Sequence, residues 1–419
     1  MAVDTPARIA ILGAGPIGLE TALYARFLGY DVDIYERGRV CEHIRRWSHV
    51  RMFSPFGLNA SPLGIAALVA QEPTWRVPAA DALLTGAEFL EQYLLPLASS
   101  DLIEDYLHLE TEVLAIAKTE ALKGELFQQE ERGDEDFRLL VRDKSGAERY
   151  AEADVVIDAT GVFGQPNSLG PGGLPALGER DGADQLERGL PDVQGADRVH
   201  FAEKHVAVIG EGFSAATNVI ALTELAKRYR QTRVTWITRS SGHGEGPMRR
   251  IANDQLPERD RIAATANALA NSDQVAWLPE SVVRAVSRSN ENGTWALQLA
   301  GSATQELVVD QVIANVGYRP DSAIYRELQV DECPATDGPA RLSSMLTAQG
   351  ATDCLSVTAG VPDSLLTSEP NFYVLGAKSY GRRSNFLLLN GIRQIRELFK
   401  IIGDRDSLDL YKTIGGVQL

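Results

Sequence analysis

Apolar and polar residues alternate with two different periods at the start of the chain. Residues 8–12 form an apolar run that ends at a glycine, which predicts a buried parallel strand. Residues 16–28 carry apolar side chains at helical spacing and stop at Gly29, which predicts a helix. Residues 31–36 alternate between apolar and polar positions and predict a second strand. Together the three segments predict a β-α-β unit.

The same order of elements recurs about 195 residues later. The repeat predicts a strand at 205–209, a helix at 214–229 and a strand at 233–238. Because both units predict parallel strands joined by a helix, we expect an α/β fold of two Rossmann-like domains, each with the three-layer ββα arrangement.

Weaker patterns complete the outline of the fold. Residues 39–78 are expected to be irregular, whereas Gly, Pro and Asp crowd residues 164–195 and predict a surface linker. Further helices are predicted at 86–98, behind Thr85, and at 390–402, and further strands within 101–150 and 275–299 and at 154–159, 310–315 and 372–375.

The composition is that of an ordinary globular protein, and the charge is strongly acidic. Hydrophobic residues make up 44% of the 419 positions, so a large core can form. Lys and Arg total 41 against 57 Asp and Glu, a net charge of −16 that disfavours nucleic acid and anionic membranes as partners. Without a leader-like start or a bilayer-length apolar run, we expect a cytoplasmic protein with a small-molecule substrate. The oligomeric state stays open, a homodimer being one option.

The turn after the first predicted strand has the sequence Gly13-Ala14-Gly15-Pro16-Ile17-Gly18. In a dinucleotide-binding turn the first glycine permits the sharp bend, the second lets backbone approach a pyrophosphate, and the third allows helix–strand packing. The helix N-terminus directs amide groups at the phosphates. Glu36, at the end of the second strand, would accept hydrogen bonds from ribose hydroxyls and repel a 2′-phosphate. The first site is therefore predicted to bind FAD or NAD(H), and a chance glycine-rich turn is the weaker alternative.

The turn of the second unit has the sequence Gly210-Glu211-Gly212-Phe213-Ser214-Ala215, in which alanine is an accepted third residue. We place Arg239 at the position that matches Glu36, followed by Ser240. A guanidinium and a hydroxyl suit a 2′-phosphate and predict NADPH, with Arg249 and Arg250 as further candidates. A solvated surface arginine is the alternative for Arg239.

A reducing nicotinamide beside a second dinucleotide implies hydride transfer, for which the common partner is a flavin.

Three further segments carry a family resemblance: Ala159-Thr160-Gly161 with Gly164 and Pro166, Asn315-Val316-Gly317-Tyr318-Arg319-Pro320, and Asn371-Phe372-Tyr373-Val374-Leu375-Gly376. They resemble the domain-crossing turns and the closing strand of flavoproteins with two dinucleotide-binding domains, in the flavin-containing monooxygenase-like branch. The departures from the family pattern are Asn315, Val316 and the sequence Gly376-Ala377-Lys378.

The resemblance implies that an NADP(H) domain is inserted into an FAD domain. The expected parts are residues 1–165 and 316–419 for FAD binding, 166–202 for a linker and 203–315 for NADP(H) binding. It also implies that Arg51 and Ser54 lie in the active site, with ordinary loop packing as an equal alternative. Further FAD contacts are implied at Arg37, Trp47, Val113, Thr160, Gly161 and Gly376.

Cysteine and histidine patterns exclude two neighbouring classes. The three cysteines form no Cys-x-x-Cys pair, so the dithiol relay of disulfide reductases cannot operate. The histidine fingerprint of Baeyer–Villiger enzymes is missing from the residues before Gly210. Cys41 follows Glu36 too closely to match the redox cysteine of single-cysteine reductases and is expected to be a small buried or loop residue. No metal site is expected.

The sequence therefore predicts an NADPH-dependent FAD oxidoreductase. The leading hypothesis is a monooxygenase that oxygenates a small nitrogen- or sulfur-containing substrate through a flavin C4a-hydroperoxide. An alternative is a flavin reductase or oxidase that passes electrons to a quinone, a disulfide or oxygen. A non-catalytic flavin-binding sensor stays open because of Glu211, whose carboxylate would oppose a pyrophosphate unless it points outward.

Overall fold

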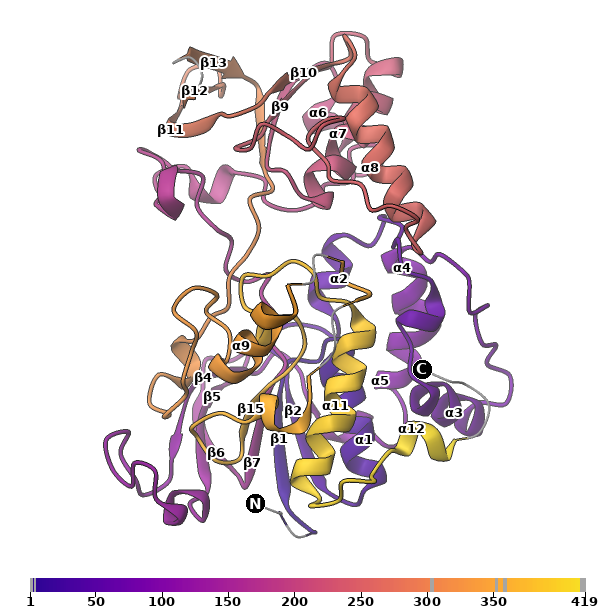
Figure 1. Ribbon diagram of the computed structural model, residues 1–419, viewed down its shortest axis with the longest axis vertical. Coiled ribbons are helices and arrows are strands. Elements are labelled where there is room, and N and C mark those ends of the chain that lie inside the picture. Colours follow the sequence, from indigo (N-terminus) through magenta and orange to yellow (C-terminus); the bar gives the residue numbers. More distant parts are fainter. Residues whose placement is uncertain (1–2, 4, 302–304, 351–352, 357–359, 415–419) are drawn as a thin grey trace. The chain divides into compact units, whose positions relative to one another are not determined.

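The computed structural model describes residues 3, 5–301, 305–350, 353–356 and 360–414 (Figure 1). The chain divides into two compact units. The first comprises Met1–Ser48, Pro55–Gln165 and Arg319–Leu419, and the second comprises His49–Ser54 and Pro166–Tyr318. In sequence, the second unit is therefore inserted into the first.

The first unit is built on a parallel five-stranded sheet in the order β15-β7-β1-β2-β3. Its strands are β1 (Arg8–Leu12), β2 (Asp31–Tyr35), β3 (Leu107–His108), β7 (Val155–Asp158) and β15 (Phe372–Val374). Every residue of β7 is buried, as expected of a parallel strand covered on both faces. On one face, α1 (Pro16–Phe27) and α11 (Leu388–Ile402) pack side by side (Figure 1).

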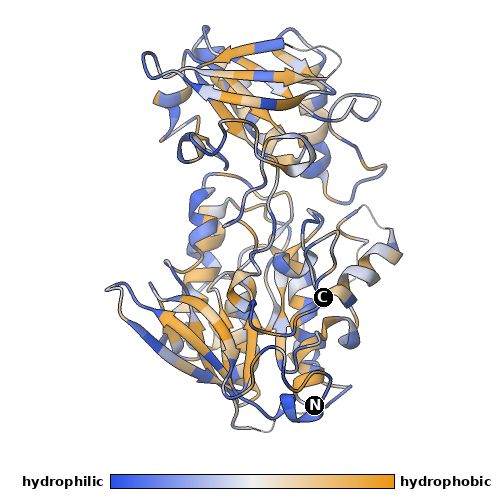
Figure 2. Cartoon of the chain, turned by 90° about the vertical axis from the view of Figure 1, so that its left-hand side faces the viewer, coloured by the Kyte–Doolittle hydropathy of each residue, from blue (hydrophilic) through white to orange (hydrophobic). Residues whose placement is uncertain are grey.

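An antiparallel sheet covers the other face of this parallel sheet. It consists of β4 (Glu112–Lys118), β5 (Phe137–Arg142) and β6 (Glu148–Ala153). Ile116, Phe137 and Leu139 of this sheet share a core with Ala10 and Val156 of the parallel sheet. The predicted three-layer ββα order is therefore present in the first unit, and Figure 2 shows hydrophobic residues concentrated along most of its strands.

Two helices lie within residues 39–78, which were expected to be irregular. The helices of the first unit beyond α1 and α11 are α2 (Glu42–Arg46), α3 (Pro62–Gln71), α4 (Gly86–Phe89), α5 (Leu95–Ala98), α9 (Ala340–Gln349), α10 (Pro362–Leu365) and α12 (Leu410–Thr413). The prediction for residues 39–78 is thus wrong at α2 and α3. Helix α3 begins at Pro62 behind Ser61, whose Oγ accepts the Gly64 N–H at 2.8 Å. Its nearly unbroken apolar sequence hides the helical period.

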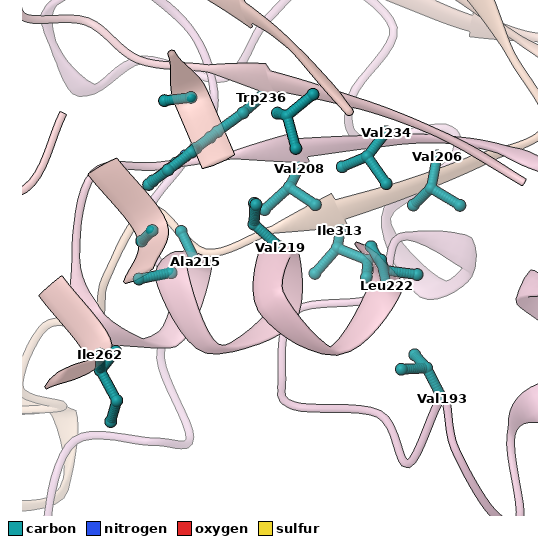
Figure 3. Close-up of a cluster of buried hydrophobic side chains, with 14 of the residues drawn as sticks. Val193, Val206, Val208, Ala215, Val219, Leu222, Val234, Trp236, Ile262 and Ile313 are labelled. Carbon is teal, nitrogen blue, oxygen red and sulfur yellow. The ribbon is translucent and has the colours of Figure 1, made fainter. Parts of the chain in front are cut away.

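The second unit repeats the same plan. A parallel sheet in the order β10-β9-β8-β14 lies between helices and an antiparallel sheet (Figure 1). Its elements are α6 (Arg198–Phe201), β8 (His205–Ile209), α7 (Phe213–Arg228), β9 (Arg233–Ile237), α8 (Pro257–Ala270), β10 (Val275–Leu278), β11 (Val282–Arg288), β12 (Trp295–Ala300), β13 (Gln305–Val309) and β14 (Gln311–Ala314). Figure 3 shows its core, in which Trp236 and valines of β8 and β9 face Val219 and Leu222 of α7.

The segment predicted to be a linker, residues 166–202, is part of the second unit. Leu169, Leu186, Val193 and Phe201 are all buried in the cores of that unit. Single apolar residues spaced among Gly, Pro and Asp are enough to fix such a segment, which composition alone does not reveal.

A buried carboxyl group ties the end of the chain to α1. Glu20 is 3% exposed, and Tyr411 of α12 donates a hydrogen bond to its Oε1 at 3.0 Å. Burial raises the pKa of Glu20 to about 7, while hydrogen bonds from Ser61 and Tyr411 lower it in part. The folded protein therefore binds a proton here between pH 4.5 and 7 that the unfolded chain releases.

Glu20→Gln should change how stability depends on pH. Because the folded-state pKa is raised, the wild-type free energy of unfolding should fall by up to roughly 3 kcal/mol as pH rises from 4.5 to above 7. Glutamine keeps an acceptor for Tyr411 but has no charge, so the variant should be flatter across this window and more stable than wild type at pH 8. Thermal unfolding at several pH values tests this, with Glu91→Gln at an exposed position as the control. Parallel profiles for wild type and Glu20→Gln would contradict it.

Candidate functional site

The first glycine turn is held by contacts between backbone segments. Gly13 has φ +96°, and its N–H donates to the Tyr35 carbonyl at 2.8 Å. A Cβ on Gly13 would lie 2.9 Å from the Ala159 carbonyl oxygen, and one on Gly18 would overlap the Gly13 carbonyl. By contrast, no described atom lies within 4 Å of a Cβ built on Gly15. The outer two glycines are therefore required by packing, whereas Gly15 borders open space suited to a pyrophosphate.

The helix that follows offers unsatisfied amide groups to this space. Gly15 is the N-cap of α1, Pro16 is its first residue, and among the described residues no side chain caps the helix. Such an N-terminus attracts a phosphate. Ile17 lies against Gly376, whose Cβ would be 3.3 Å from Ile17 Cγ1. The structure thus brings together Ile17 and Gly376, which the sequence predicted to share a cofactor.

Glu36 lies at the end of β2, beside the glycine turn. Its Oε2 accepts the Ala14 N–H at 3.0 Å, and its Oε1 accepts the Gly38 N–H at 2.8 Å. A carboxylate has about four lone-pair sites, so it can still accept hydrogen bonds from ribose hydroxyls. The Glu36 carbonyl accepts the Thr111 N–H at 2.9 Å, which places the start of β4, and with it Val113, near this end of the site.

Arg37 extends from the same strand end toward the turn after β7. A Cβ on Gly164 would lie 2.9 Å from Arg37 Nη2, so the guanidinium lies directly against that glycine. The predicted contact residue Arg37 therefore lies beside the turn that contains Thr160 and Gly161.

A buried ion pair fixes the turn at Thr160. Lys378 is 1% exposed, and its Nζ lies 2.5 Å from Asp158 Oδ2 and 3.1 Å from Thr160 Oγ1. Asp158 Oδ1 accepts both the Thr160 N–H at 3.0 Å and the Thr160 hydroxyl at 2.7 Å. Lys378, which departs from the family pattern, therefore forms a buried ion pair with Asp158. The sequence analysis missed this pair, although an acid before Ala-Thr-Gly and a lysine after the last strand were both visible.

Trp47 and the segment His49–Ser54 belong to different units. A Cβ on Gly86 would lie 2.8 Å from Trp47 Cζ3, so the indole packs on that glycine within the first unit. Residues 49–54 belong to the second unit, where the Phe53 ring lies 5.5 Å from that of Phe213.

The two predicted catalytic residues have unlike surroundings in this segment. Ser54 is buried, and Arg51 is exposed near Glu258. The pKa of Glu258 is lowered first by its hydrogen bond from Arg261 and further by the charge of Arg51. The active-site role of Arg51 and Ser54 stays a prediction.

Cys41 lies against the first glycine turn but is a poor nucleophile. It is 3% exposed, and its Sγ lies 3.4 Å from the Ala14 carbonyl oxygen. Burial raises the pKa of the thiol well above its ordinary value, and the nearby charge of Glu36 raises it further. The thiol is therefore protonated at neutral pH, which makes it unreactive. The prediction of a small buried cysteine is confirmed.

The second glycine turn has the same backbone constraint. Gly210 has φ +134°, and a Cβ there would overlap the Asn315 carbonyl, whereas no described atom lies within 4 Å of a Cβ on Gly212. Asn315, a departure from the family pattern, accepts the Asn218 Nδ2–H at 2.7 Å and donates to the Gly189 carbonyl at 2.9 Å. It thereby ties the end of β14 to α7.

The residues in the first turn of α7 differ in their exposure to solvent. Ala215 is fully buried, Phe213 is partly buried and Ser214 is exposed. Gly212 is the N-cap of α7, and no described side chain caps that helix. Its N-terminus thus resembles that of α1 in having amide groups available for a phosphate.

Strand register corrects the predicted match between Arg239 and Glu36. Leu12 pairs with Tyr35 in the first unit, and Ile209 pairs with Ile237 in the second. The position that matches Glu36 is therefore Thr238, and Arg239 matches Arg37. The prediction placed the end of this strand one residue too late. Arg239 still lies at the edge of the site, with its side chain 80% exposed.

Glu211 points toward the end of β9. Its Oε2 accepts the Ser240 N–H at 3.1 Å, and its Oε1 lies 3.7 Å from Arg239 Nη2. Because this carboxylate is turned toward the strand end, the argument for a non-catalytic sensor loses its support. Arg250, a further candidate for the 2′-phosphate, pairs with Asp260 at 2.9 Å and lines a cavity of about 800 Å³ together with Arg249.

The residues with described positions lack two features. Among them, no three His, Cys, Asp or Glu side chains form a group that could hold a metal ion. Within the same residues, no helix is both long and apolar enough to cross a bilayer.

Lys378→Met should unfold the turn at Thr160 and destabilise the first unit. The variant leaves Asp158 buried without its cation, which typically costs about 3–5 kcal/mol. Lys227→Met, which breaks an exposed ion pair with Glu224, should cost less than about 1 kcal/mol. Urea unfolding of both variants measures the difference. Equal and small losses would show that the Lys378–Asp158 pair does not support the turn.

Comparison with known proteins supports the fold and the family. Residues 71–337, more than half of the chain, match the sequence model of the pyridine nucleotide-disulphide oxidoreductase family. No curated protein matches the sequence.

Solved structures with the same fold cover nearly the whole chain. Bacillithiol disulfide reductase from Bacillus cereus has 18% identity and a TM-score of 0.66, covering 96% of this chain and 100% of its own. The cadaverine monooxygenase DfoA of Erwinia amylovora, bound to FAD, has 13% identity and a TM-score of 0.64, covering 99% and 97%. The ornithine N-hydroxylase of Kutzneria sp. 744, with reduced FAD and NADP⁺, has 14% identity and a TM-score of 0.59, covering 96% and 100%.

These similarities confirm the predicted α/β fold of two Rossmann-like domains. The predicted cofactors, FAD and NADPH, are those of the matching family. With its two glycine turns and this match, the chain belongs to the pyridine nucleotide-disulphide oxidoreductase family of FAD- and NAD(P)-dependent oxidoreductases.

Proposed function

We propose that this chain is an NADPH-dependent FAD monooxygenase that oxygenates a small nitrogen- or sulfur-containing substrate. The observation that carries the proposal is the state of Cys41. This thiol lies against the first glycine turn, yet it is buried and its pKa is raised well above the ordinary value. A relay through a dithiol needs a reactive thiolate with a second thiol next to it. The chain has no Cys-x-x-Cys pair, which supports direct action of the flavin on the substrate.

The residues of the first unit would hold FAD. The N-terminus of α1 and the open side of Gly15 would take the pyrophosphate, and Glu36 would accept hydrogen bonds from the adenosine ribose. The Lys378–Asp158 pair would keep Thr160 and its turn in place around the cofactor. When bound, FAD supplies both hydride acceptance and oxygen activation, which no amino-acid side chain supplies.

The residues of the second unit would hold NADPH. Gly212 leaves open space beside the N-terminus of α7, where the exposed Ser214 is also available. Arg239 is exposed and carries the charge that a 2′-phosphate requires. In both units the main chain would bind the pyrophosphate, and side chains would bind only the ribose end of the nucleotide.

An aliphatic amine is the substrate class to test first. The chain carries a net charge of −16, and such a field raises the local concentration of cations. Two of the structural neighbours are a cadaverine monooxygenase and an ornithine N-hydroxylase. Because their identity to this chain is low, they serve only to guide the choice of test compounds.

A reductase is the second candidate function. The match to the pyridine nucleotide-disulphide oxidoreductase family and the fold similarity to bacillithiol disulfide reductase favour it. In this case reduced flavin would pass its electrons directly to a quinone, a disulfide or oxygen, without incorporation of oxygen into a product.

Gly15→Ala and Gly212→Ala should each remove one cofactor without unfolding the protein. Gly15 and Gly212 have ordinary φ values of −80° and −98°, and their Cβ atoms would meet no described atom within 4 Å. The methyl group would instead occupy the space into which a pyrophosphate must fit. We expect Gly15→Ala to lower the FAD content and Gly212→Ala to weaken NADPH binding, each with the melting temperature of the cofactor-free wild type. Gly124→Ala, also in open space but far from either turn in sequence, is the control. Full cofactor binding in both variants would contradict the proposed sites.

The coupling of NADPH oxidation to product separates the two candidate functions. FAD-loaded protein would be assayed for NADPH oxidised and hydrogen peroxide released, with and without cadaverine, ornithine and a thioether. A monooxygenase should release less peroxide per NADPH with its substrate and form an oxygenated product, detected by mass spectrometry. Cys41→Ser should leave the rate unchanged, because the thiol takes no part. Stoichiometric peroxide with every compound, or loss of turnover in Cys41→Ser, would favour the reductase.

A further inference from the structure

The second unit lacks an acid at the strand position that carries one in the first. Thr238 matches Glu36 in strand register, and it is 1% exposed. Its hydroxyl accepts the Trp277 Nε1–H at 3.0 Å and donates to the Ser240 carbonyl at 3.2 Å. Thr238 is therefore engaged in the protein and cannot recognise a ribose.

A carboxylate from the glycine turn takes the place of the missing acid. In the first unit, Glu36 Oε1 accepts the Gly38 N–H at 2.8 Å. In the second, Glu211 Oε2 accepts the N–H of Ser240 at 3.1 Å, and Ser240 is the residue that matches Gly38 in register. A carboxylate thus accepts a hydrogen bond from the equivalent backbone amide in both units. It comes from the strand end in the first unit and from the glycine turn in the second.

The positively charged Arg239 lies beside the Glu211 carboxylate. Arg239 Nη2 lies 3.7 Å from Glu211 Oε1, and the Arg239 side chain is 80% exposed. An exposed pair of this kind contributes little to stability, so the arginine can leave it for a stronger partner. A carboxylate at this place accepts a hydrogen bond from a free ribose 2′-hydroxyl and repels a 2′-phosphate, whereas an arginine attracts the phosphate.

We propose that Glu211 is the residue that recognises the unphosphorylated adenosine ribose in the second cofactor site. It allows NADH to bind there as well, with an affinity within about a hundredfold of that of NADPH, and Arg239 is the determinant that favours NADPH. This inference rests on the proposed assignment of the second glycine turn to a pyridine nucleotide, and it deepens that assignment by naming what sets the nucleotide preference.

Binding measurements on the full-length, FAD-loaded protein test the role of Glu211 without turnover. Dissociation constants for NAD⁺ and NADP⁺, and for the fragments ADP and 2′,5′-ADP, would be measured by calorimetry. Glu211→Gln should weaken NAD⁺ and ADP by about tenfold through loss of a charged acceptor, and should strengthen NADP⁺ and 2′,5′-ADP. Arg239→Gln should weaken only the two phosphorylated ligands, again by about tenfold.

Glu224→Gln is the matched control, because it removes the same charge from an exposed position on α7. Wild-type FAD content and melting temperature would show that each variant is folded. Equal changes for NAD⁺ and NADP⁺ in Glu211→Gln, of the size seen in Glu224→Gln, would overturn the role of Glu211. A wild-type preference for NADP⁺ of more than about a hundredfold would also overturn it. Binding of none of the four ligands to the wild type would be a different result, which removes the proposed nucleotide site itself.

Discussion

Both units depend on one steric constraint: where the first strand of each β-α-β unit ends, backbone segments approach so closely that no side chain fits between them. In the first unit Gly13 meets the turn at Ala159, and Gly18 meets the Gly13 carbonyl; in the second, Gly210 meets Asn315. This packing fixes the direction in which each following helix begins. The amide groups that would bind phosphates are therefore positioned by the main chain, independently of the surrounding side chains.

The same constraint explains which features the sequence could predict. A glycine turn between an apolar run and a helix is a local signal, so both turns and their flanking strands were placed to within a residue or two. The errors arose where the structure depends on distant partners. The end of β9 is set by pairing of Ile237 with Ile209, which no local pattern reveals, and so the sequence alone places Arg239 one position away from its actual match. Likewise, Lys378 and Asp158 are 220 residues apart in sequence.

The two units form equivalent carboxylate–amide hydrogen bonds with residues from different segments. Each has a carboxylate at the end of its second strand, close to the glycine turn. In the first unit Glu36 supplies it from the strand side, where its hydrogen bonds to Ala14 and Gly38 hold it. In the second unit the buried Thr238 occupies that position, and Glu211 of the glycine turn supplies the carboxylate. A duplicated fold can therefore keep an interaction while moving the residue that makes it to the opposite segment.

The short segment His49–Ser54 gives the chain an unusual connectivity, because it belongs to the second unit while its flanking residues belong to the first. The polypeptide consequently passes between the units at four points in its sequence instead of two. A fragment cut at residues 166 and 318 would leave behind the ring of Phe53 that packs on Phe213, and would expose this apolar surface at the start of α7. Exchange of the nucleotide-binding half between family members would accordingly have to carry two separate stretches of sequence.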